Sequence, residues 1–421
     1  MARILLLTEF FPPETFAGAN RVGSMVAALA RSHDVVVLTV QPSYPSPDAY
    51  RPDAAAEFDR GQGFRVVRQP AFIAHSRSLL RRAVREQLLA LRLGARALAE
   101  PADVVMSSTP SMFLGPVCLA LARVKGARFV WDVRDVGWEF AGESERLTPR
   151  LRVPLAALRR SMWWVAGQAD LVVAATPGIA ALLGARVGAD RVLVAGNSVS
   201  GEMLDACAAC SEDVVKQRPL VSYVGLVGDA QGLEVLLDVA RTLPDVEFLV
   251  VGDGPQRSTL ETAAGAMGLE NLRLTGYLPR PGVLDVYRRS DVLFAQLRDT
   301  PTLNSTGLPS KLHEYMATGK PIVYAGRGLA AETLSGIGCA RIAAPGRSGA
   351  VAGAIVDLLA DPDVRKAMGA RGRAYVVAAG DRETAFSQLV ASVGRPMPDR
   401  PTSRRLWVGL QRRAAPRRGR R

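Results

Sequence analysis

Residues 299–320, DTPTLNSTGLPSKLHEYMATGK, combine the residue types that bind an anion at the start of a helix. The turn residues 307–310 place backbone amides at the expected helix entrance, where unpaired N–H groups and the helix dipole favour phosphate. Lys311 adds a mobile positive charge. Glu314 follows on the same helix face and can accept hydrogen bonds from the hydroxyls of a nucleotide ribose. We interpret this stretch as a phosphate site; the alternative is a capped surface helix with a solvated Lys/Glu pair.

The length and composition of the chain predict an ordinary globular protein of two domains. Its 421 residues exceed what one core usually serves. With 48% hydrophobic and 22% charged residues, the chain is neither disordered nor fibrous. Four cysteines are too few for a disulfide framework and indicate a reducing cytoplasm. Because a structural zinc ion needs two ligands more than Cys207 and Cys210 supply, we expect these two to be buried or incidental thiols.

Neither a secretory signal nor a membrane span is expected. The apolar run over residues 4–7 is short and is followed at once by Glu9 and two prolines. The longest uncharged stretch, residues 104–122, contains SSTPS and Pro116, which favours a strand, a loop and a helix.

Strand-like segments alternate with helical ones, which predicts parallel β/α units and two consecutive Rossmann-like, doubly wound domains. The expected strands are ARILLLT, DVVVLTV, FRVVRQ, DVVMSST, RFVWDVR, DLVVAAT, LVSYVG, VEFLVVGDG, LRLTGYL, DVLFAQL and PIVYAG. We expect a first domain over residues 1–198, a linker over 199–219 and a second domain over 220–375. Ligands of open α/β sheets lie outside the carboxyl ends of strands, so the loops after these strands are the expected site.

Several enzyme classes lack their signature in this chain. After the first strand, EFFPPETFAGAN contains one glycine rather than G-x-G-x-x-G, which disfavours a nicotinamide enzyme. ATGKP ends in proline where a P-loop requires Ser or Thr, and there is no G-x-S-x-G elbow. ATPase and serine-hydrolase functions are therefore disfavoured.

Six segments in order resemble glycosyltransferase family 4, the retaining nucleotide-sugar enzymes with the GT-B fold. They are ILLLTEFFPPE, RFVWDVRD, GDAQGLEVLL, FLVVGDGPQR, GLPSKLHEYMATGKP and MGARGRAYV. They are most similar to the branch that makes bacterial surface polysaccharides, including fucosamine transferase-like proteins. The resemblance covers nearly the whole chain to about residue 390. It implies two domains facing across a cleft, with a terminal helix over residues 376–396 crossing back to the first domain.

The resemblance also implies a role for each matching position. Ser310 and Lys311 would bind the donor diphosphate, and Glu314 would accept hydrogen bonds from the ribose. The other implied donor-site positions are Gly18 at the sugar-phosphate, Gly276, Tyr277 and Leu278 at the base, and Gly225, Gly252 and Gly254 in strand-end loops; for the last two a plain turn is the alternative. The implied catalytic residues are Lys311, Glu314 and, facing the cleft from the first domain, Asp135 and Glu139. For this last pair the alternative is a surface ion pair with Arg134.

The chain departs from the family pattern at three positions. Thr306 stands where many members carry an acid, and Leu226 and Gln231 stand where Arg and Lys are common. We interpret these as branch differences and expect Lys311 to be the chief cation at the leaving diphosphate. No Asp-x-Asp element is placed to hold a divalent ion, so we predict a metal-independent enzyme that needs no cofactor besides a donor linked to UDP or GDP.

Basic segments predict an anionic partner. Residues 397–421 form a basic tail in which nine arginines and no acid follow from position 400, and this tail accounts for much of the net charge of +13. Helical spacing over residues 77–96 gathers arginines at 77, 81, 85, 92 and 96 opposite leucines, and residues 150–164 combine arginines with two tryptophans. We expect peripheral binding to an anionic membrane from the cytoplasmic side. The alternatives are a disordered tail and helices with solvated basic faces.

The sequence thus predicts a cytoplasmic glycosyltransferase that moves a sugar from a nucleotide donor to a polysaccharide or lipid-linked glycan. Two rivals remain: a GT-B-fold sugar-nucleotide epimerase, and a basic nucleic-acid-binding protein. Against the second, positive charge is concentrated in the tail and no nucleic-acid module is recognisable, so we expect no specific nucleic-acid partner.

Overall fold

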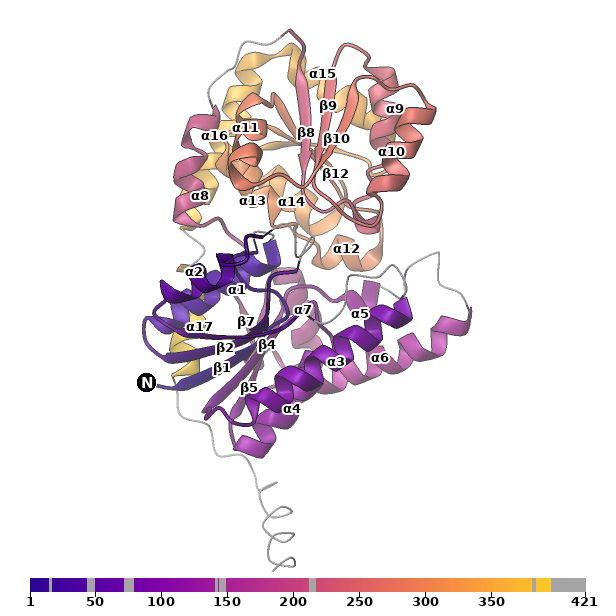
Figure 1. Cartoon of the computed structure of the whole chain (residues 1–421). Coiled ribbons are helices and arrows are strands. Elements are labelled where there is room, and N and C mark those ends of the chain that lie inside the picture. The colour runs from indigo at the N-terminus through magenta and orange to yellow at the C-terminus, as the bar shows by residue number, and fades with distance from the viewer. Residues whose placement is uncertain are drawn as a thin grey trace, which may run out of the picture.

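The computed structural model describes residues 1–14, 17–43, 50–71, 79–140, 143, 149–211, 217–380 and 384–394. These residues form two lobes, one above the other in Figure 1, each built on a parallel sheet with helices on both faces. The predicted fold class, two doubly wound parallel-sheet domains, is confirmed. The predicted basic tail lies outside the described residues.

Seven parallel strands of the described chain form the first sheet: β1 (Arg3–Leu7), β2 (Asp34–Val40), β3 (Arg65–Gln69), β4 (Val104–Ser108), β5 (Arg128–Val133), β6 (Leu171–Ala174) and β7 (Val192–Val194). Their order in the sheet is β3-β2-β1-β4-β5-β6-β7. The strand order therefore reverses between β1 and β4, where Ile4 lies opposite Val104. Open α/β sheets bind their ligands at such a reversal, outside the carboxyl ends of the strands.

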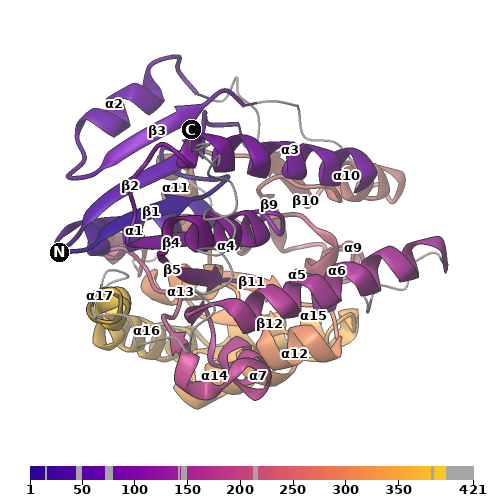
Figure 2. The same cartoon turned by 90° about the horizontal axis from the view of Figure 1, so that it is seen from below.

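Helices cover both faces of the first sheet: α1 (Ala17–Ala30), α2 (Ala54–Arg60), α3 (Leu79–Ala97), α4 (Leu114–Lys125), α5 (Gly137–Phe140), α6 (Pro149–Gln168), α7 (Pro177–Val187) and, from the other end of the chain, α17 (Ser387–Val393). Successive strand residues point to opposite faces. Leu5 and Leu7 accordingly pack with α3, α4, α6 and α7, whereas Ile4 and Leu6 pack with α1 and α17. Figure 2 shows α3, α4 and α6 alongside one another, with α17 away from them.

The second sheet repeats this plan with six described strands: β8 (Leu220–Val224), β9 (Glu247–Val251), β10 (Leu272–Gly276), β11 (Val292–Gln296), β12 (Ile322–Ala325) and β13 (Ala340–Ala343). The order β10-β9-β8-β11-β12-β13 places the reversal between β8 and β11. The helices are α8 (Gly201–Ala206), α9 (Val235–Thr242), α10 (Arg257–Ala266), α11 (Arg280–Arg289), α12 (Pro301–Thr306), α13 (Lys311–Ala317), α14 (Gly328–Ile337), α15 (Ser348–Ala360) and α16 (Pro362–Ala379). The short strand β13 and the helix α12, which lies within the predicted loop, were not foreseen.

The chain returns to the first lobe after α16. Val376 of α16 is buried in the core of the second lobe, whereas Phe386, Leu389 and Val393 are buried against β1 and α1 of the first lobe. The Arg128 guanidinium donates to a carbonyl of α17 at 2.9 Å. The C-terminal segment therefore connects both lobes.

Helix α12 forms polar contacts between the lobes. Thr176 Oγ1, after β6, donates to the Thr306 carbonyl at 2.9 Å. The backbone N–H and the hydroxyl of Thr302 donate to Glu143 Oε1 at 3.1 and 2.7 Å. The segment that leads into α13 therefore starts at the domain interface.

The orientation of α3 corrects the predicted cationic face. Arg85 points inward and pairs with the buried Glu9 at 2.5 Å, and Arg96 pairs with Glu100 at 2.9 Å. The exposed large hydrophobic side chains here are instead Val84, Leu88 and Leu91 of the helix and Leu98 just after it. We call these four residues the apolar ridge. Of the other predicted arginines, 77 and the side chain of 81 lie outside the described residues.

Two further sequence expectations concern single features. Cys207 and Cys210 are both buried, as expected of structural thiols. Within the described ranges, none of the helices combines the length and the hydropathy needed to cross a bilayer.

Candidate functional site

The loops after β8, β9 and β10 pack against one another at the carboxyl edge of the second sheet. The Gly252 N–H donates to the Gly276 carbonyl at 2.8 Å. A Cβ at Gly252 would collide with the Gly225 carbonyl oxygen, and one at Gly254 would collide with the Val227 carbonyl. All four of these glycines have positive φ, a region that side chains disfavour. The structure thus gives Gly252 and Gly254 a role in strand-end packing and brings Gly225 to the strand-order reversal.

Lys311 reaches the end of β8 from the first turn of α13. Its Nζ lies 3.7 Å from the centroid of the Tyr223 ring and donates to the Tyr223 hydroxyl. That hydroxyl donates in turn to the Leu226 carbonyl at 2.5 Å. A Cβ at Gly225 would lie 2.6 Å from Nζ, so the glycine leaves room for the lysine. Burial lowers the pKa of Lys311 to about 7, and the nearby Glu314 carboxylate opposes part of that shift.

A pair of tyrosines fixes the position of α13 relative to the sheet. Tyr287 donates from its hydroxyl to Glu314 Oε2 at 3.1 Å. The Tyr315 hydroxyl accepts from the Val224 N–H at 2.7 Å and donates to the Val224 carbonyl at 3.2 Å. The two rings meet edge to face at 5.8 Å. Glu314 and Lys311 are therefore held on a helix that is fastened to the end of β8.

The remaining predicted donor-site positions in the second lobe lie at the same edge. Ser310 is the residue before α13 and is half-buried, and its hydroxyl makes no capping hydrogen bond. Gly276 ends β10, Tyr277 is exposed after it, and Leu278 packs against the core beside α11. The structure therefore brings Gly225, Ser310, Lys311 and Glu314 together, with Gly276 and Tyr277 further along the edge.

The three departures from the family pattern have local roles. The Thr306 hydroxyl donates to the Thr302 carbonyl at 2.7 Å, within its own helix. The Leu226 side chain is exposed, and Gln231 Oε1 accepts from the Gly228 N–H at 3.2 Å. These contacts leave Lys311 as the cation that the described chain places beside Gly225.

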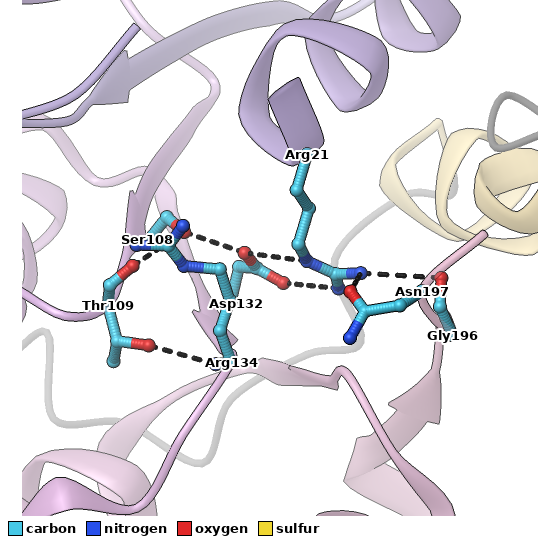
Figure 3. Close-up of polar contacts among 7 residues, drawn as sticks. All are labelled: Arg21, Ser108, Thr109, Asp132, Arg134, Gly196 and Asn197. Atoms are coloured by element: carbon cyan, nitrogen blue, oxygen red, sulfur yellow. Dashed lines mark hydrogen bonds and ion pairs between the residues drawn. The ribbon is translucent and has the colours of Figure 1, made fainter. Parts of the chain in front are cut away.

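The carboxyl edge of the first sheet holds a buried ion pair that sequence patterns did not reveal. Arg21 of α1 donates to Asp132 of β5 at 2.8 Å, and Ser108 of β4 donates to the same carboxylate at 2.7 Å (Figure 3). Arg21 also reaches the Gly196 carbonyl and Asn197 Oδ1 at 3.4 and 3.5 Å. The pair ties α1, β4, β5 and the segment after β7 into one rigid wall.

Of the predicted first-lobe residues, the two acids behave differently. Asp135 is exposed after β5, and its carboxylate accepts only the nearby Gly137 N–H at 3.3 Å among the hydrogen bonds of the described chain. Glu139 Oε1 accepts from Arg159 at 2.8 Å and from the Trp163 indole at 2.5 Å, so its carboxylate joins α5 to α6. Its partner is therefore Arg159 rather than Arg134. Gly18, half-buried, is the second residue of α1.

The described residues have the GT-B fold of two facing parallel-sheet domains, which solved glycosyltransferases share. The sucrose-phosphate synthase of Thermosynechococcus elongatus has the same fold, with a TM-score of 0.72 and 18% identity over 97% of this chain and 100% of that one. HepE of Anabaena in complex with UDP and glucose has a TM-score of 0.68 and 16% identity over 93% and 99%. At these identities the likeness shows the fold alone.

Sequence comparison identifies both domains. Residues 17–198 match the family of glycosyl transferase 4-like domains, and residues 211–375 match that of glycosyl transferases group 1. The chain therefore carries the two domains of these glycosyltransferases in order. This finding does not favour the epimerase alternative.

Curated relatives are also glycosyltransferases. A putative colanic acid biosynthesis glycosyl transferase, WcaI of Escherichia coli, is 26% identical over 80% of this chain and 87% of its own length. A GDP-mannose-dependent phosphatidylinositol monomannoside mannosyltransferase of Mycolicibacterium smegmatis is 26% identical over 89% and 94%. The 2-deoxystreptamine glucosyltransferase of Streptomyces kanamyceticus is 29% identical, but the match spans only 47% of this chain and 54% of that one.

Proposed function

We propose that the protein transfers a sugar from a nucleoside diphosphate sugar, UDP- or GDP-linked, to a polysaccharide or lipid-linked glycan with retention of configuration. The observation that carries this proposal is the grouping of Gly225, Lys311 and Glu314 at the strand-order reversal of the second sheet, where α/β folds bind nucleotides. A relative named as GDP-mannose-dependent and a structural neighbour solved with UDP and glucose support a nucleotide-sugar donor. The likeness to WcaI supports the surface-polysaccharide branch.

Lys311 is the main source of positive charge in the proposed mechanism. As the anomeric carbon becomes oxocarbenium-like, negative charge grows on the leaving diphosphate. The Lys311 ammonium and the backbone amides before it stabilise that charge more in the transition state than in the ground state. Because the pKa of Lys311 is about 7 without a ligand, a bound diphosphate shifts it to the charged form. The leaving phosphate then takes the proton of the acceptor hydroxyl, and no metal ion is part of the proposal.

A nucleotide panel tests the donor site. We expect UDP or GDP to raise the melting temperature of the protein, because a ligand that binds only the native state stabilises it. Lys311→Ala should lower turnover by about 100- to 1000-fold, the effect of removing one preorganised donor at a developing negative charge. The exposed Lys366 of α16 is the matched control, and Lys366→Ala should leave turnover unchanged. Equal turnover of both variants and the wild type would remove Lys311 from the mechanism.

We further propose that the protein works at the cytoplasmic face of a membrane that carries anionic lipids. The apolar ridge of α3 is exposed, and Val124 of α4 and Trp164 of α6 are exposed on the neighbouring helices. The Arg123 guanidinium lies 5.5 Å from the Trp164 ring, which joins the two helices at this surface. Arg152, Arg159 and Arg160 of α6 are also exposed. Apolar side chains flanked by arginines fit the headgroup layer of an anionic bilayer.

Flotation of vesicles containing phosphatidylglycerol tests this surface. Leu91 is 56% exposed on the ridge, and Val377 is 52% exposed on α16 of the other lobe. We expect Leu91→Glu to lower the bound fraction at low salt and Val377→Glu to leave it unchanged. A chain ending at residue 396 measures the contribution of the tail separately. Equal binding by the two glutamate variants, or no binding by the wild type, would contradict the proposal.

A further inference from the structure

Two arginines lie at the carboxyl edge of the first sheet, and they differ in their partners. Arg21 is buried and paired with Asp132, as described above. Arg134 directly follows β5, and its backbone N–H donates to Thr109 Oγ1 at 2.9 Å, at the end of β4 (Figure 3). The two guanidinium groups are close enough for their charges to repel.

The Arg134 guanidinium has no hydrogen bond or ion pair with any residue that the structure describes, and its Nε is shielded from solvent. The carboxylates of Asp132, Asp135 and Glu9 lie near enough to offset part of its charge, but none of them forms an ion pair with it. Asp132 is already bound by Arg21 and Ser108, and the Asp135 carboxylate accepts from Gly137 instead. Desolvation lowers the pKa of Arg134, which means that its charge is held in an environment unfavourable to it. A desolvated charge of this kind lowers the stability of the folded protein unless an anion binds it.

The strand-end loop that binds the Arg134 backbone holds a second unpaired donor. Ser111 is 2% exposed, and its hydroxyl has no partner in the described chain. Ser111 is two residues after Thr109, which binds the Arg134 backbone, so both donors belong to adjoining strand-end loops. The loops after β5 and β6 contact the second lobe, as Glu143 and Thr176 show, and this edge therefore borders the space between the lobes.

We propose that Arg134, with Ser111 as a second donor, binds a phosphate group of the acceptor. The inference rests on the proposed function, in which the donor occupies the second lobe and the acceptor must lie against the first. A planar guanidinium recognises oxyanions by two parallel hydrogen bonds. A doubly charged phosphate monoester is attracted to the Arg134 guanidinium about twice as strongly as a singly charged carboxylate at the same distance. This site therefore fits a phosphorylated acceptor, such as a lipid-linked glycan, better than a neutral glycan.

Thermal unfolding of the free protein separates a binding role from a structural role. Arg134→Met removes a desolvated charge that has no ion-pair partner among the described residues, so its melting temperature should equal or exceed that of the wild type. Arg21→Met is the matched control, since it leaves the buried Asp132 without its cation and should melt several degrees lower. If Arg134→Met melts as low as Arg21→Met, Arg134 is structural and the proposal is overturned.

Titration with inorganic phosphate tests the ligand directly. We compare the melting temperature in sodium phosphate with that in sodium chloride at equal ionic strength. We expect a rise of a few degrees for the wild type and for Lys311→Met, in which the proposed donor site is disabled, and a smaller rise for Arg134→Met. The same rise in all three proteins would overturn the proposal.

Two further ligands are tested. Dihexanoyl phosphatidic acid distinguishes a lipid phosphate from a soluble one, and a nucleotide distinguishes failure of this inference from failure of the proposed function. A larger shift with dihexanoyl phosphatidic acid than with inorganic phosphate, lost in Arg134→Met, supports a lipid phosphate. An equal, Arg134-dependent shift supports the phosphate of a soluble acceptor. Nucleotide binding to Arg134→Met tests the proposed donor site independently of the proposed acceptor phosphate site. If the nucleotide stabilises this variant as it does the wild type, while phosphate shows no dependence on Arg134, only the acceptor inference fails.

Discussion

Replacing Lys311 with methionine should make the free protein more stable and the enzyme much slower. The ammonium lies above the Tyr223 ring, beside Gly225, where burial holds its pKa at about 7 instead of the ordinary 10.5. Folding must therefore desolvate a charge that, in the proposed function, the donor diphosphate later compensates. Methionine keeps the length and the apolar stem of the side chain without that charge. A gain in stability together with a loss of activity is the signature of a residue kept for function.

The size and the pH dependence of the stability gain follow from the lowered pKa of Lys311. The difference between 10.5 and about 7 is about 3.5 pKa units, and at ~1.36 kcal/mol per unit its ceiling is about 5 kcal/mol. Because Lys311 is only partly buried, solvent screening reduces the expected gain to about 2 kcal/mol. The pKa of the folded state is the lower one, so the penalty is fully present below pH 7. It shrinks as the pH rises from 7 towards 10.5, where the unfolded chain binds more protons than the folded one.

Urea unfolding of both proteins at pH 6, 8 and 9 measures this effect. The stability advantage of Lys311→Met should be largest at pH 6 and smallest at pH 9. Lys366→Met is the control, since its ammonium is exposed on α16, and it should show no such advantage. A Lys311→Met protein that is less stable than the wild type, or an advantage independent of pH, would refute the reasoning about a desolvated charge.

Two further predictions concern the neighbours of Lys311. Glu314→Gln keeps an acceptor for Tyr287 but weakens the bonds to ribose hydroxyls, so the Kd for UDP or GDP should rise about tenfold, the loss of about 1.4 kcal/mol from a charge-assisted bond. Calorimetry at pH 6, where Lys311 is charged, should find pyrophosphate binding unchanged, and an equal loss for pyrophosphate would contradict the ribose role. Gly225→Ala should lower turnover about tenfold or more, because its Cβ would lie 2.6 Å from Lys311 Nζ. In a Lys311→Ala background the same change should cost little further turnover, and additive losses would show that the two positions act separately.

Helix α3 shows the limit of prediction from periodicity. The spacing of its residues predicted a helix with separate apolar and basic faces. Instead Leu91 of the helix and Leu98 just after it are exposed to solvent, and Arg85 points inward to Glu9. Leu89 and Leu93 fill the core instead. With apolar residues on more than one side, the pattern could not decide which side packs, because that depends on the partner that β1 presents. Tyr223 escaped notice for a similar reason, since a tyrosine in a buried strand has the pattern of a core residue.

The sequence by itself determined the alternation of strands and helices, the class of the fold and the helix that begins with Lys311, because these depend on local periodicity and turn chemistry. It also located Gly225 and Glu314, whose positions relative to strand ends can be read along the chain. Only the tertiary structure decided which charges find partners. Arg21 and Asp132 are 111 residues apart and form a buried pair, whereas Arg134, two residues from that aspartate, has no ion-pair partner among the described residues. Whether two charges pair depends on their distance and burial in the folded protein, and sequence separation predicts neither.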